Sequence, residues 1–140
     1  LAPFLGERGD VKPWDLTDAL DAGNARVAVV TARRLMSAGE RHALQVLAQL
    51  HTHYSRLARL DGANVSTRED AEEVLGVKGF VADKALKAYR SIGPNGVRMS
   101  FELLARADVD LRGGTSLDAE TVVDVLVARL ARLARVTRRS

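Results

Sequence analysis

Residues 73–86 read EVLGVKGFVADKAL, and after a gap residues 103–113 read LLARADVDLRG. The first stretch predicts the end of a short helix, a turn at Leu75-Gly76 and a second helix that opens at Phe80, because glycine is favoured where a helix stops. The second stretch predicts the last half of a longer helix, closed by Arg112 and Gly113. Together they indicate helices joined by short turns.

Helical patterns also dominate the rest of the chain. Apolar residues recur at spacings of three and four along residues 40–60 and 118–138, which we expect to be the two longest helices. Further helices are expected over residues 14–22, 25–38, 66–75, 80–91 and 97–111. The sequence therefore predicts an all-α fold, a compact bundle of about six or seven helices.

The same patterns predict where helices begin and end and which faces they bury. Expected N-caps are Asp15, either Ser66 or Thr67, and Ser116, and expected breaks are Gly39 and the run Gly93-Pro94-Asn95-Gly96. The helix over residues 25–38 is expected to bury Val27, Val30 or Thr31, and Leu35. Other residues expected in the core are Leu47, Tyr54, Phe101 and Leu126.

The composition favours a single folded domain. The chain has 140 residues, of which 46% are hydrophobic, and this is enough apolar material for a packed core. It has no cysteine, which excludes disulfides and thiolate metal sites. It contains no long apolar run for a membrane span and no signal-peptide pattern, so we expect a cytoplasmic protein. Residues 1–13 are expected to be a linker or the end of a preceding domain, and residues 14–140 the helical domain.

No pattern for catalysis, cofactor binding or metal binding is found. His51 and His53 are two residues apart, so on a helix they point to different sides, and we interpret both as structural. Acidic residues gather at a helix start, where the helix dipole explains them. The glycine-rich runs lack the lysine and the spacing of a phosphate-binding loop. We therefore expect no catalytic site, no cofactor and no metal in this chain.

A helix-turn-helix DNA reader is an alternative interpretation of residues 71–86. Such motifs place Leu-Gly three residues after a small alanine, whereas Leu75 lies four residues after Ala71. The second helix would begin with Phe80 and carry Asp83, which suits a phosphate backbone badly. The alternative function is therefore that of a DNA-binding regulator.

In their order, these motifs resemble the C-terminal collar domain of the delta subunit of the bacterial DNA polymerase III clamp loader. The resemblance rests on WDLTDAL at residues 14–20, the turn Leu75-Gly76-Val77, Phe80-Val81, and residues 107–113. The chain departs from the family at Gly79, where a proline is common, and at Arg112, where a lysine is common.

The resemblance implies a fragment of a larger subunit that has no catalytic site of its own. Residues 1–13 would be the end of a lid domain, and residues 14–140 an oligomerisation domain in a ring with the tau/gamma and delta-prime subunits. The sliding clamp would be bound through an N-terminal domain outside this chain, and DNA through the assembled complex. The implied role is subunit assembly for loading the clamp in DNA replication.

The last helix supplies the candidate interface. Its apolar stripe is wider than one core face needs, and the candidate residues are Val123, Val127 and Leu130, with Arg129 and Arg132 at the rim. The competing interpretation is that both stripes are buried within the bundle. After Asp124 the chain has no acidic residue, and the arginines that follow favour weak, salt-sensitive contact with DNA at most.

Overall fold

The computed structural model describes residues 11–12, 14–37 and 42–139, with side chains up to residue 134. All regular elements of this part are helices, which confirms the predicted all-α bundle. The elements are α2 (Asp15–Asp21), α3 (Ala25–Ser37), α4 (Ala43–Ala63), α5 (Arg68–Leu75), α6 (Gly79–Val109), the π-helical turn η1 (Asp110–Gly114) and α7 (Ala119–Arg139). The expected break at Gly39 and nearly all of the expected linker over residues 1–13 lie outside the described residues.

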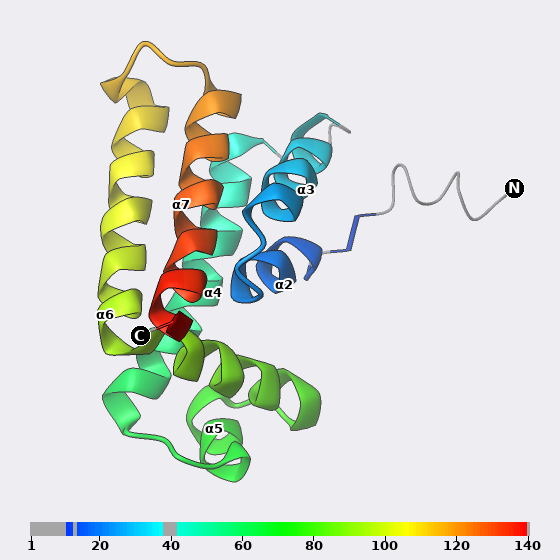
Figure 1. Ribbon diagram of the computed structural model, residues 1–140, viewed down its shortest axis with the longest axis vertical. Coiled ribbons are helices and arrows are strands. Elements are labelled where there is room, and N and C mark those ends of the chain that lie inside the picture. Colours follow the sequence, from blue (N-terminus) through cyan, green and yellow to red (C-terminus); the bar gives the residue numbers. More distant parts are fainter. Residues whose placement is uncertain (1–10, 13, 38–41, 140) are drawn as a thin grey trace, which may run out of the picture.

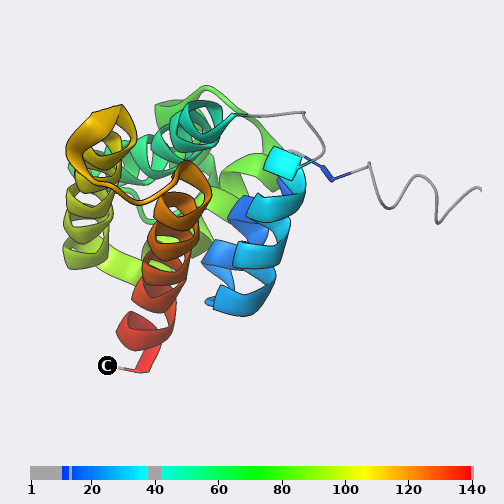
Figure 2. The ribbon, with the colours of Figure 1, turned by 90° about the horizontal axis from the view of Figure 1, so that it is seen from above.

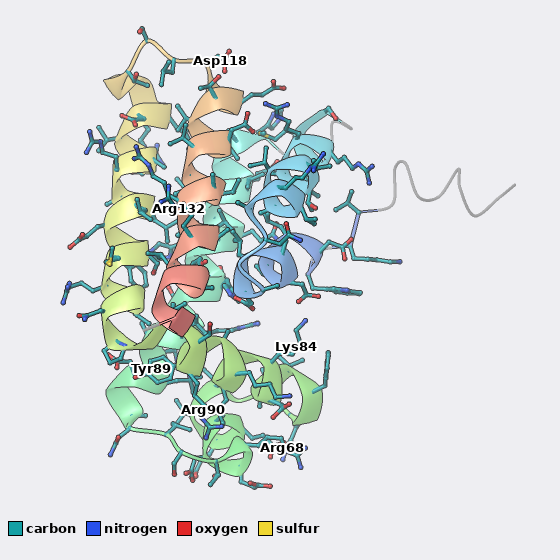
Figure 3. All side chains as sticks on the ribbon, viewed as in Figure 1. Arg68, Lys84, Tyr89, Arg90, Asp118 and Arg132 are labelled. Atoms are coloured by element: carbon teal, nitrogen blue, oxygen red, sulfur yellow. The ribbon has the colours of Figure 1, made fainter. Side chains whose placement is uncertain are left out.

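Three long helices stand side by side, and two smaller parts flank them (Figure 1). Seen from above, α7 lies between α6 and α3, with α4 on the far side (Figure 2). The short helix α2 packs against both α3 and α7. Below the bundle, α5 and the first half of α6 form a small lobe. A hydrogen bond of 2.6 Å from the Tyr89 hydroxyl to Asp61 connects this part of α6 with α4, and both Tyr89 and Arg90 are labelled in Figure 3.

The turn that the sequence singles out is built as predicted. Thr67 is the N-cap of α5, and its side-chain oxygen accepts a hydrogen bond of 3.1 Å from the Asp70 backbone N–H. Gly76 ends the helix with a φ of 71°, a left-handed conformation in which glycine avoids the strain of a Cβ atom. At α2, by contrast, Trp14 holds the N-cap position, so the prediction that Asp15 caps this helix is wrong.

The run Gly93-Pro94-Asn95-Gly96 is a sharp kink within α6, where a loop was expected. Only Gly93 leaves helical geometry, with a φ of 66° and a ψ of −175°, and the helix resumes at Pro94. Proline suits this place because its fixed φ fits a first helical position and no backbone N–H is needed there. Counted across the kink, α6 has 31 residues and is longer than α4 and α7, which have 21 each. The expectation that those two are the longest elements therefore holds only for unbroken helices.

We expect Gly93→Ala to lower the free energy of unfolding by about 1–3 kcal/mol, because its backbone angles are almost exclusive to glycine. A Cβ atom built at Gly93 meets nothing within 4 Å, so the cost comes from the backbone alone. The matched control is Gly62→Ala, at an open position within α4, which should raise stability by about 0.5–1 kcal/mol. Chemical denaturation measures both, and equal effects of the two variants would contradict the kink.

The core is made almost entirely of leucine, valine and alanine side chains. Leu47, Tyr54 and Leu126 are buried, which confirms three of the four core predictions. Phe101 is only partly buried, because it packs edge-on against His51 at the margin between α4 and α6, with ring centroids 5.5 Å apart. No described helix combines the length and apolar character needed to cross a membrane.

Candidate interaction site

Val123, Val127 and Leu130 are core residues of α7, so the expectation that they form an unpaired apolar flank is corrected. Val123 and Val127 have no exposed surface, and Leu130 is 1% exposed. The physical reason is the central place of α7, which packs against α6, α3 and α2 and therefore buries two adjacent stripes. Arg129 and Arg132 are exposed. The side chains of Arg135, Arg138 and Arg139 lie outside the described residues.

The buried face of α3 is also corrected. The helix buries Ala28, Thr31, Ala32 and Leu35 against its neighbours, so of the two alternatives Thr31 is inside and Val30 is outside. Val27 is 46% exposed and Val30 is 45% exposed. Because they lie three residues apart on a helix, they form one apolar stripe on the outer face. Exposed Arg26 and Arg34 lie on the same helix.

The described histidines have structural partners. His53 Nε2 lies 2.8 Å from Asp21 Oδ1, and this contact ties α4 to α2. His51 packs edge-on against Phe101. Among residues 11–12, 14–37 and 42–139, no three histidine or acidic side chains are grouped so that they could hold a metal ion.

The alternative DNA-reading helix has its polar residues engaged within the chain. The helix α5, a short turn and the start of α6 do follow one another as a helix-turn-helix would. However, Lys84, which is labelled in Figure 3, has its Nζ 2.5 Å from Asp18 of α2, and Lys87 Nζ lies 3.2 Å from Asp83 on the same helix. Both lysines therefore have acidic partners within the chain.

A groove of about 880 Å³ lies between α2, α4 and the first half of α6. Trp14 and Phe80 are on its lining, and they are 52% and 73% exposed. Phe80 has the highest exposure of the large hydrophobic residues in the described part of the chain. Exposed aromatic side chains at a concave site are typical of binding surfaces. Sequence reasoning missed this groove, although Phe80 had been recognised as a helix start.

A smaller hollow of about 500 Å³ lies between α4 and the second half of α6. Leu44, His51 and Phe101 supply an apolar wall, and Asp108 and Arg112 supply its charged edge. The two charged side chains are 2.9 Å apart and one helical turn from each other, so they neutralise one another. We see no acid/base pair here that would support catalysis.

Three side chains of the described residues have a raised pKa, and each shift favours the protonated state that the group already has at neutral pH. Burial raises the pKa of Tyr54, and the hydrogen bond to Asp61 raises the pKa of Tyr89 to about 12. The Asp124 carboxylate, 2.6 Å from Arg33 Nη2, raises the pKa of this guanidinium. These directions fit structural contacts within the fold, and none of the three moves its group toward titration at pH 7.

Asp118 caps α7, where Ser116 was expected to do so. Asp118 lies at the start of the helix (Figure 3), and its Oδ1 accepts a hydrogen bond of 2.8 Å from the Thr121 backbone N–H. This bond, with a further one from the Thr121 side chain, lowers the pKa of Asp118 from its usual 3.8. A carboxylate is favoured here because it also faces the positive end of the helix dipole.

We expect the stabilising effect of Asp118 to depend on pH. A carboxyl group whose pKa is lowered by folding stabilises fully above its unfolded-state pKa, and the effect is lost as the pH falls through the folded-state pKa. The melting temperature of Asp118→Ala should therefore lie below that of the wild type at neutral pH and approach it at about pH 2. In Asp118→Asn, which keeps an acceptor, the melting temperature should lack this pH dependence. A wild-type advantage that stays constant down to about pH 2 would disprove the cap.

Comparisons of the chain with models of known protein families, with curated proteins and with solved structures found no match.

Proposed function

We propose that this chain is an assembly module of the clamp-loader collar type, the C-terminal domain of a delta subunit of bacterial DNA polymerase III. It would help to hold a ring of subunits together in the cytoplasm so that the sliding clamp is loaded in DNA replication. It would carry no catalytic residue and would contact DNA through the assembled complex.

The observation that carries the proposal is where the resembling motifs lie in the fold. Trp14 stands at the N-cap of α2, and Leu75-Gly76 ends α5 with a left-handed glycine. Arg112 and Gly113 close the long α6 in the turn η1. The motifs therefore coincide with helix ends, where sequence governs geometry, and this supports a shared architecture.

The outer face of α3 is the best candidate for the contact with a neighbouring collar. Val27 and Val30 form its apolar centre, and Arg26 and Arg34 supply charge beside it. An apolar centre with a charged rim is the usual anatomy of a protein interface. On this proposal the stripe on α3 replaces the α7 residues as the site that a partner subunit covers.

Native mass spectrometry with purified tau/gamma and delta-prime subunits from the same organism tests the proposal. We expect the chain to join those subunits in a complex of fixed stoichiometry at micromolar concentration. If it stays free, and instead binds one duplex DNA sequence at physiological salt, the regulator interpretation is correct and the assembly role is wrong.

A further inference from the structure

The groove between α2, α4 and the first half of α6 has an apolar lining and an uneven distribution of charge. Leu57, Val81 and Ala85 line it together with the exposed rings of Trp14 and Phe80. Aromatic side chains that are half or more exposed leave a large apolar area in contact with water, and covering that area is favourable. The groove therefore suits a ligand with at least one large apolar side chain.

The charges of the groove favour a ligand that also carries a carboxylate. Its two acidic residues already have cationic or imidazole partners, because Asp18 pairs with Lys84 and Asp21 pairs with His53. Arg56 is on the same lining, and no carboxylate of the described residues lies within ion-pair distance of it. A half-buried guanidinium is well suited to a carboxylate, which it can bind with two parallel hydrogen bonds.

We infer that this groove docks a protein segment that presents a large apolar side chain next to a carboxylate. The apolar side chain lies between Trp14 and Phe80, and the carboxylate pairs with Arg56. A nucleic acid suits the groove less well, because Lys84 is already paired with Asp18, so that mainly Arg56 is left to meet a row of phosphates. The inference does not depend on the clamp-loader role, since the groove and the stripe on α3 are on different elements.

Trp14 is the only tryptophan of the chain, so its fluorescence reports on the groove without a label. The probes are two acetylated, amidated peptides, DLFDLFD and its neutral counterpart NLFNLFN. We expect the acidic peptide to shift the Trp14 emission to shorter wavelength and to bind roughly tenfold more tightly than the neutral one. This preference should vanish in Arg56→Gln. Binding of both peptides should weaken by roughly tenfold in Phe80→Ala, which removes the apolar anchor.

Melting temperatures serve as the check that the variants are folded. The melting temperature of Phe80→Ala should stay near that of the wild type because Phe80 is mostly exposed. Val109→Ala, at a 60% exposed position outside the lining of the groove, is the matched control and should leave both affinities unchanged. Equal affinity for the two peptides, or no binding of either at millimolar concentration, would overturn the inference. So would displacement of the acidic peptide by oligothymidylate, or a Trp14 shift that follows self-association of the chain without any peptide.

Discussion

Replacing Leu50 with alanine is expected to lower the free energy of unfolding by about 2–5 kcal/mol, the largest effect on stability that we foresee. Leu50 is fully buried in the middle of α4, which packs mainly against α6. The substitution removes apolar contact and leaves a cavity that a close-packed bundle fills only in part. Urea denaturation followed by far-ultraviolet circular dichroism measures the change.

Leu44→Ala is the matched control on the same helix. Leu44 is 42% exposed, so its truncation should change the free energy of unfolding by no more than about 0.5 kcal/mol. If Leu50→Ala also lowered the free energy of unfolding by no more than about 0.5 kcal/mol, the inner face of α4 would lie in solvent, which would contradict the packing described above.

On the proposed function, replacing both Val27 and Val30 with glutamate is expected to weaken association with the tau/gamma and delta-prime subunits by tenfold or more. Fully burying an exposed valine contributes roughly 1.5–3 kcal/mol, so covering the half that is still exposed at each position contributes roughly 1 kcal/mol, and a glutamate in its place would have to be desolvated. Both positions are on the outer face of α3, so the fold of the variant should be retained. Surface plasmon resonance with an immobilised partner subunit measures the affinity.

Leu117→Glu is the control variant, because it also introduces a negative charge and removes an exposed apolar side chain, but at a position away from α3. Leu117 is 55% exposed and lies in the loop before α7, on a different element from the stripe on α3. We expect full affinity from this variant. If the α3 double variant also binds with full affinity while keeping its melting temperature, α3 is not the contact.

The helices, and the cap and stop of α5, were predictable because they depend on neighbours in the sequence. Thr67 and Gly76 act through hydrogen bonds and backbone angles within one turn of the chain. The kink was harder to predict, since a Gly-Pro pair is as typical of a loop as of a sharp bend between two helices. Only the packing of both halves of α6 against the rest of the bundle distinguishes these possibilities.

The binding surfaces were not predictable from periodicity. A helical stripe shows that one face is apolar, but the number of neighbouring helices decides how wide the buried face must be. The stripe of α7 is wide because several helices surround it, so Val123 and Leu130 are inside. Val27 and Val30 are as apolar as core residues and yet lie outside. The groove brings together Trp14, Arg56 and Phe80, which are far apart in the sequence.

On the proposed function the chain is part of a longer delta subunit, and deletion of residues 14–140 from that subunit tests the assembly role most directly. The measurement is the yield of the clamp-loader ring on size-exclusion chromatography, with the deleted and the intact subunit mixed separately with tau/gamma and delta-prime. We expect the intact subunit to enter the ring and the deleted one to elute apart from it. Entry of the deleted subunit at an undiminished yield would contradict the role of this helical domain in assembly.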